Sequence, residues 1–74
     1  MDFDKEEELL KAYGKHLRIL RHKNDFSQEG LALASGVAIS SISRIERGQL
    51  NPTLTTLIKI QRALGIDQRE IIDF

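Results

Sequence analysis

Apolar residues recur every three or four positions along the chain, and no segment shows the sustained two-residue alternation of a half-buried strand. Near the N-terminus the recurring residues are Leu10, Tyr13, Leu17 and Leu20, and basic residues lie between them. This spacing places the apolar side chains on one face of a helix. The sequence therefore predicts an all-α fold, and its 74 residues have room for one domain with a small core.

Helix start and stop signals divide the chain into five predicted helices. The predicted helices span approximately residues 5–23, 28–35, 38–47 and 54–64, and a fifth begins after Asp67. Ser27 and Thr53 are favourable N-cap residues for the second and fourth helices. Asp67 and Glu70 have the spacing of a capping box, which predicts the start of the fifth helix. We expect connections of only a few residues between the helices, as in a compact bundle.

The composition excludes several classes of function. The chain has no cysteine, which excludes disulfide frameworks, thiolate metal sites and thiol catalysis. The two histidines, His16 and His22, are six residues apart, so they face different directions on a helix, and neither belongs to a recognisable catalytic motif. We therefore expect no enzymatic activity, no cofactor, no metal site and no small-molecule substrate. Because the sequence has no signal peptide and no apolar run of membrane-spanning length, we expect a cytoplasmic protein.

The formal net charge is zero, but the charges are unevenly distributed. Residues 1–8 carry five acidic residues and one lysine, whereas residues 9–63 carry nine basic and three acidic residues. A basic middle segment is compatible with nucleic-acid binding, and it is equally compatible with an ordinary helical surface of mixed charge. The charge pattern therefore does not decide between these interpretations.

A short connection that contains glycine joins the second and third predicted helices. It consists of residues 34–37, Ala-Ser-Gly-Val. Small residues let the two helices approach each other, and Gly36 can adopt a positive φ without steric cost. Two short helices joined in this way are typical of a helix-turn-helix, although an ordinary corner between two helices of a bundle has the same spacing.

The order of residues favours the helix-turn-helix. The stretches concerned are Leu17-Arg-Ile-Leu-Arg21, Ser27-Gln-Glu29, Leu31-Ala32, Ser35-Gly-Val37, Ile42-Ser-Arg-Ile-Glu-Arg-Gly48, Asn51-Pro52, Leu57, Ile60 and Ala63-Leu-Gly65. Over about residues 13–72 the chain resembles the Cro and phage-repressor family of regulators, also called the XRE family, and it is similar to restriction-modification controller proteins. The resemblance implies a compact five-helix, lambda-repressor-like DNA-binding domain over residues 9–74. Residues 1–8 would form an acidic N-terminal arm or the start of the first helix.

The resemblance also implies roles for individual residues in sequence-specific binding of double-stranded DNA. The third predicted helix would enter the major groove, with base-reading positions at Ile39, Ser40, Ser43 and Arg44. Phosphate-contacting positions would be Gln28, Ser41, Arg47 and Asn51. Arg44 is a candidate for a bidentate contact to guanine, and a phosphate contact is an equal alternative. Arg21 and Glu46 match a pair that forms a structural salt bridge in relatives.

Four residues depart from the pattern of the family, and one of them is Gly30, which stands within the second predicted helix where a helix former is expected. Ala38 stands where a serine or threonine usually caps the recognition helix, and alanine is a poor N-cap. Ile39 replaces a polar residue, often glutamine, at the first base-facing position, where it could pack against a thymine methyl group. Leu33 is apolar where relatives usually expose a charge, so it is either an ordinary exposed leucine or a contact with a partner.

A homodimer that binds a palindromic operator is the expected state, because a single short recognition helix covers few base pairs. Ile58, Ile72 and Phe74 are the expected interface residues. The expected function is that of a transcriptional repressor or controller associated with the nucleoid. The alternative is an antitoxin-like protein-interaction module that also binds its own promoter, since fold does not fix function.

Overall fold

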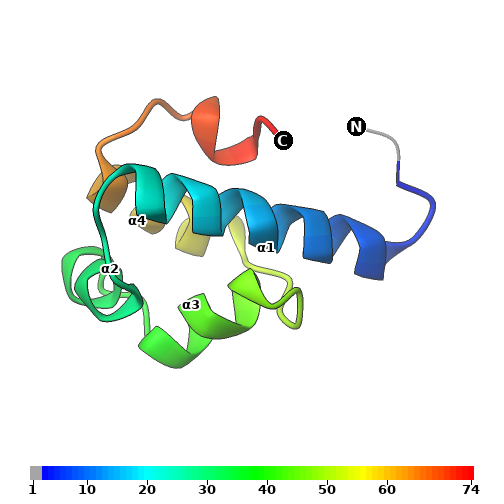
Figure 1. Ribbon diagram of the computed structural model, residues 1–74, viewed down its shortest axis with the longest axis horizontal. Helices are drawn as coiled ribbons and strands as arrows, with labels where there is room; N and C mark the ends of the chain where they lie inside the picture. The colour runs from blue at the N-terminus through cyan, green and yellow to red at the C-terminus, as the bar shows by residue number, and fades with distance from the viewer. Residues whose placement is uncertain (1–2) are drawn as a thin grey trace.

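The computed structural model describes residues 3–74, which form four α-helices and a short C-terminal 3-10 turn (Figure 1). The elements are α1 (Glu6–Lys23), α2 (Gln28–Ser35), α3 (Ile39–Glu46), α4 (Leu54–Leu64) and η1 (Glu70–Ile72). The all-α prediction is confirmed. Residues 1–2 of the expected acidic arm lie outside the described residues, and Glu6–Glu8 form the first turn of α1.

The prediction of a fifth α-helix is wrong, because the segment after Asp67 contains only the 3-10 turn η1. The Asp67 carboxylate accepts a hydrogen bond from the backbone N–H of Arg69, at 2.8 Å, instead of capping Glu70. The backbone N–H of Glu70 donates to the carbonyl of Asp67, at 3.0 Å, which is an i→i+3 bond. Aspartate side chains that bond to the backbone two residues on favour a local turn over a helix.

In the middle of the chain, the helices begin and end at residues whose side chains or backbone conformation favour a helix end. Ser27 Oγ accepts a hydrogen bond from Gly30 N–H at 2.9 Å, and Thr53 Oγ1 accepts one from Thr56 N–H at 3.1 Å. Gly36 ends α2 in the left-handed conformation, with a φ of 74°. Ala38 precedes α3 without a side-chain hydrogen bond, as the poor capping residue predicts.

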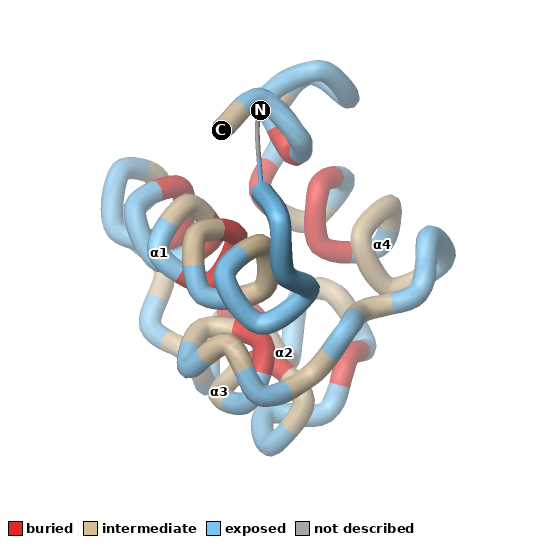
Figure 2. The backbone as a smooth tube through the Cα atoms, turned by 90° about the vertical axis from the view of Figure 1, so that its right-hand side faces the viewer, coloured by how far each residue is buried: buried red, intermediate tan, exposed pale blue. Residues whose placement is uncertain are grey.

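Helix α1 runs along the long axis of the molecule, with α2 and α3 on one side and the C-terminal segment on the other (Figure 1). Buried positions lie on the inner sides of the helices (Figure 2). The core contains Tyr13, Leu17, Leu20, Leu31, Val37, Ile42, Ile45, Ile60, Leu64 and Ile71. Because α2 and α3 bury only their inner faces in this core, their outer faces remain available to a ligand. No helix within residues 3–74 is both long and apolar enough to span a bilayer.

Helix α1 passes unusually close to the end of α3, and the contact is made at Gly14. A Cβ atom added to Gly14 would lie 2.5 Å from the carbonyl oxygen of Glu46 and 2.6 Å from that of Ile45. Both distances are far below van der Waals contact. Glycine at this position therefore sets how closely α3 can approach α1.

Candidate nucleic-acid interface

Helices α2 and α3 are joined by Gly36, Val37 and Ala38. The positive φ of Gly36 turns the chain after α2, and its N–H donates to the carbonyl of Ala32 at 2.9 Å. Val37 is buried in the core, and its N–H donates to Ser35 Oγ at 3.1 Å. The turn is therefore held by its own hydrogen bonds and by one buried side chain, which keeps α3 at a fixed angle to α2.

The two faces of α3 differ in chemistry. Ile42 and Ile45 point into the core and are almost completely buried. The predicted base-reading residues lie on the remaining surface, where Ile39, Ser40 and Arg44 are exposed and Ser43 is half-buried. Residues 40, 43, 44 and 47 have i, i+3, i+4, i+7 spacing and share one face. This face carries two hydroxyls and two guanidinium groups, all of which can hydrogen-bond to base edges or phosphates.

The predicted phosphate-contacting residues surround this face. Gln28 is half-buried at the first position of α2, and Ser41 is half-buried in the first turn of α3. Arg47 is exposed at the C-cap of α3, where its Nε lies 3.3 Å from the carbonyl oxygen of Ser43. Asn51 is exposed in the loop after α3 and donates from Nδ2 to Glu6 Oε1 at 3.3 Å.

The end of α3 is fixed by a buried hydrogen-bond network around Glu46. Arg21 donates from Nε to Glu46 Oε2 at 2.6 Å and from Nη2 to Oε1 at 2.9 Å. The two side chains are only 8% and 5% exposed. The remaining guanidinium nitrogen, Nη1, donates to the carbonyl of Phe26 at 2.9 Å. The hydrogen bond to Glu46 holds the pKa of the Arg21 guanidinium above its ordinary value, so this guanidinium stays charged at neutral pH.

Gln28 connects this network to the start of α2. Its Nε2 donates to Glu46 Oε1 at 3.2 Å. One carboxylate therefore joins α1, α2 and α3, and the close approach at Gly14 acts on the same end of α3. Together these contacts hold the outward face of α3 at a fixed angle, which a helix must have to place side chains against base edges.

Comparison with known proteins identifies this arrangement. Residues 17–71 match the helix-turn-helix family. The chain belongs to this family. Its relatives include the control protein C.BamHI of Bacillus amyloliquefaciens, which is 38% identical over 84% of this chain and 78% of the relative. An uncharacterised HTH-type transcriptional regulator of Sinorhizobium fredii, y4dJ, is 32% identical over 88% of this chain and 84% of the relative.

A solved structure shows the same fold. The restriction-modification controller protein C.AhdI of Aeromonas hydrophila matches with a TM-score of 0.84 and 40% identity, over 88% of this chain and 98% of that protein. These findings confirm the prediction of a DNA-binding, XRE-type helix-turn-helix transcription regulator. Both sequence relatives carry the names of regulatory proteins.

The residues expected at the dimer interface of this helix-turn-helix protein lie away from α3. Ile72 is 57% exposed, and Ile58 is half-buried on α4. Phe74 is half-buried, with its ring centroid 5.1 Å from that of Tyr13 and 5.6 Å from that of His16. Within residues 3–74, no group of three His, Cys, Asp or Glu side chains could hold a metal ion.

Sequence reasoning missed two residues that position the interface. Gly14 sets the distance between α1 and α3, and the only available signal was a glycine inside a strongly periodic helix. Glu6 accepts the hydrogen bond of Asn51 across 45 positions of sequence, and no local pattern predicts such a contact.

Proposed function

We propose that this protein reads one DNA sequence with α3 in the major groove and thereby regulates transcription as a repressor or controller. The observation that carries the proposal is the outward face of α3. This face is polar and basic, and its orientation is fixed by the Glu46 network and by the Gly14 contact. A rigidly held face of this kind is what direct readout of base edges requires.

The proposed base-reading residues make different kinds of contact with the bases. Arg44 donates two hydrogen bonds to guanine O6 and N7, Ser40 and Ser43 bond to base edges, and Ile39 packs against a thymine methyl group. The exposure of Arg44 and Ile39 supports these assignments. The alternative role of Arg44, a phosphate contact, predicts a different experimental result.

The proposed phosphate contacts fix the register of the protein on the duplex. Gln28 lies at the N-terminus of α2, where free backbone N–H groups and the helix dipole attract a phosphate. Arg47, Ser41 and Asn51 would contact phosphates at and after α3. Such contacts release counterions, so the affinity for DNA falls as the salt concentration rises.

We further propose a homodimer on a palindromic operator, with Ile58, Ile72 and Phe74 at or near the interface. The exposure of Ile72 and the similarity to the controller protein C.AhdI support this assembly. A two-fold dimer places two copies of α3 about one helical turn of DNA apart. Binding to the chromosome would place the protein in the cytoplasm, on the nucleoid.

The experiment that tests the proposal is a selection of bound duplexes from a random library, followed by titration of the enriched sequence at several salt concentrations. We expect a palindromic site, and we expect Arg44→Ala to relax the preference at one base pair of each half-site, at a cost of about 1–3 kcal/mol. The matched control is Lys59→Ala, which removes one exposed positive charge from α4. The control should leave the base preference unchanged.

The other outcomes are equally informative. If Arg44 contacts a phosphate, Arg44→Ala weakens binding to all sequences alike and lowers the salt slope by about one. If no sequence is enriched and binding is weak, the proposal fails, and the antitoxin-like role with a protein partner becomes the hypothesis to test by pull-down. Sedimentation at micromolar concentration tests the dimer, and a monomer with and without DNA would contradict it.

A further inference from the structure

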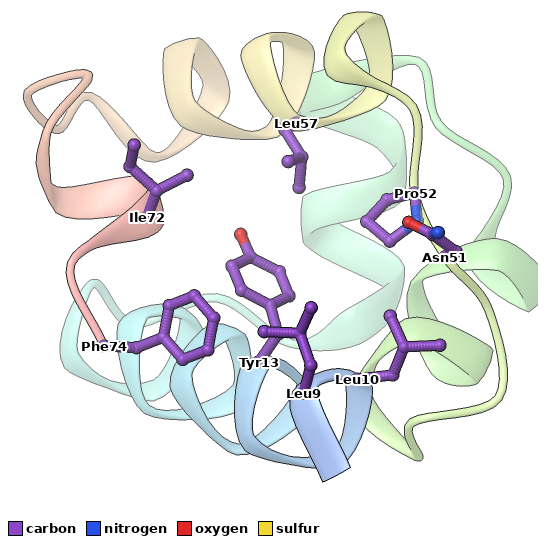
Figure 3. A pocket seen from close by; sticks show the side chains of 8 residues that line it. All are labelled: Leu9, Leu10, Tyr13, Asn51, Pro52, Leu57, Ile72 and Phe74. Carbon is purple, nitrogen blue, oxygen red and sulfur yellow. The ribbon is translucent and has the colours of Figure 1, made fainter. Parts of the chain in front are cut away.

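A pocket lies on the side of α1 that faces α4 and the C-terminal segment (Figure 3). Its volume is about 310 Å³. Its walls include Leu9, Tyr13, Asn51, Leu57, Ile72 and Phe74, and we call this space the Tyr13 pocket. None of the side chains that line it is charged.

The hydroxyl of Tyr13 points into this pocket. In Figure 3 it extends away from α1 toward the space between Leu57 and Ile72. Tyr13 is only 6% exposed, yet its hydroxyl has no hydrogen-bond partner within residues 3–74. Buried polar groups are almost always hydrogen-bonded, so each exception calls for a partner. Burial also raises the pKa of Tyr13, which keeps the hydroxyl protonated and able to donate.

We propose that the Tyr13 pocket binds a small neutral molecule with an apolar body and one hydrogen-bond acceptor, which receives the proton of the Tyr13 hydroxyl. The apolar walls exclude a charged ligand, because no side chain there would compensate its lost hydration. A closed apolar cavity of about 150 Å³ is sufficient for benzene. The larger volume of this pocket therefore accommodates a molecule of about two rings, in the lower range of ligand pockets.

The position of Asn51 connects the pocket to the DNA-binding side of the molecule. Asn51 lines the pocket, donates a hydrogen bond to Glu6 and lies in the loop that follows α3. A bound molecule that moves this loop changes the DNA contact proposed for Asn51, and linkage requires that DNA then changes the affinity for the molecule by the same factor. This second step rests on the proposed function, whereas binding in the pocket does not.

The binding step is tested without DNA, with 1-tetralone and tetralin as a matched pair of probes. The two molecules share a two-ring apolar body, and only the ketone carries an acceptor. We expect 1-tetralone to bind more tightly, on the order of fivefold, as one neutral hydrogen bond provides. Backbone NMR shifts should be concentrated at Leu9, Tyr13, Asn51 and Leu57.

The variant Tyr13→Phe provides the control, because it retains the ring and removes only the hydroxyl. It should bind both probes with the affinity that tetralin has for the wild type. The proposal is overturned if the two probes bind the wild type equally, if neither binds at millimolar concentration, or if shifts fall outside the pocket. It is also overturned if a second copy of the chain covers Tyr13 and Leu57 in solution and excludes the probes.

The coupling step is tested by titrating the selected DNA site with and without saturating 1-tetralone. We expect the affinity for DNA to change severalfold in the wild type, and the same change in Tyr13→Phe should require about fivefold more 1-tetralone. If 1-tetralone binds but the affinity for DNA stays constant, the pocket is a ligand site and its coupling through Asn51 is contradicted. If no DNA site can be selected, the proposed function fails while the binding result stands.

Discussion

The two sides of α1 are held to the rest of the protein by different kinds of interaction. On the side of α2 and α3, a buried bidentate ion pair joins Arg21 to Glu46, and the backbone of α3 touches Gly14. On the other side, Phe74 packs edge-on against Tyr13, and His16 Nε2 lies 2.6 Å from the carbonyl oxygen of Glu70. The first side adds buried directional contacts to its apolar core, whereas the second side is held mainly by apolar contacts.

The difference explains which side can be fixed and which can adapt. Directional contacts tolerate few substitutions, because removing one partner leaves the other buried without compensation. Apolar packing tolerates exchanges of similar volume and can enclose a ligand. The proposed readout of base edges requires a precise orientation of α3. The side with the Tyr13 pocket has no such requirement.

The largest effect is expected for Glu46→Ala. The variant leaves the Arg21 guanidinium buried with only the Phe26 carbonyl as partner, and it removes the acceptor of Gln28. We expect the free energy of unfolding to fall by about 3–5 kcal/mol, a large part of the total of about 5–15 kcal/mol that small domains have. Urea denaturation followed by circular dichroism measures it.

A surface ion pair provides the control for Glu46→Ala. Arg69 and Asp67 are 3.4 Å apart with side chains 91% and 52% exposed, so Arg69→Ala should change the stability by no more than about 0.5 kcal/mol. The double variant Arg21→Met/Glu46→Leu should recover part of the loss, because it leaves no buried charge. Equal effects of Glu46→Ala and Arg69→Ala would contradict the comparison between the two sides of α1.

A smaller loss is expected for Gly14→Ala. The added methyl group meets two backbone carbonyl oxygens, which cannot move without displacing α3. We expect the free energy of unfolding to fall by about 1–3 kcal/mol. The molecules that remain folded should bind DNA more weakly, because α3 is displaced. Thermal denaturation and DNA titration measure the two effects.

Gly30→Ala is the matched control, since Gly30 is also a helical glycine. An added Cβ there would meet only Ser27 Oγ at 3.1 Å and a ring carbon of Phe26 at 3.7 Å. The gain in helix propensity, about 1 kcal/mol, offsets this contact, so the stability should stay within about 1 kcal/mol of the wild type. If both alanine variants behave alike, the close approach at Gly14 does not restrain α3.

The central part of the fold could be predicted because its signals are local. Ser27, Gly36, Thr53 and Gly65 fix helix ends through hydrogen bonds or conformations that involve only neighbouring residues. The C-terminal turn could not be predicted in the same way. There Asp67 has a capping pattern, and its carboxylate bonds two residues ahead instead. Sequence alone does not decide between two local hydrogen bonds of similar strength.

The candidate site was predicted by resemblance more than by pattern. Arg44 and Ile39 are assigned to base reading because their positions match those of the XRE family. The Arg21–Glu46 pair is assigned in the same way, since its residues are 25 positions apart in the sequence. The Gly14 contact and the Tyr13 pocket depend on how separate helices pack. Such features have no periodicity or motif in the sequence, so they require coordinates.

The smallest effect is expected on the other side of α1 and depends on pH. Burial raises the pKa of Tyr13 in the folded state, whereas an unfolded tyrosine ionises near pH 10. The folded protein therefore retains a proton that the unfolded chain loses. The contribution of this difference to the free energy of unfolding is fully present below about pH 10. It is lost as the pH rises toward the pKa of Tyr13 in the folded state. Between pH 10 and 11 the wild type should lose about 1 kcal/mol more than Tyr13→Phe, since one proton is involved.

Urea denaturation of both proteins at pH 7, 10 and 11 measures this difference. At pH 7 we expect Tyr13→Phe to be no less stable than the wild type, because the hydroxyl that it removes has no partner within residues 3–74. Other groups that titrate above pH 10 affect both proteins equally, so only the difference between them reports on Tyr13. Parallel loss of stability in the two proteins would mean that the Tyr13 hydroxyl is solvated in the folded state. The two sides of α1 would then differ less in the burial of their polar groups than the structure indicates.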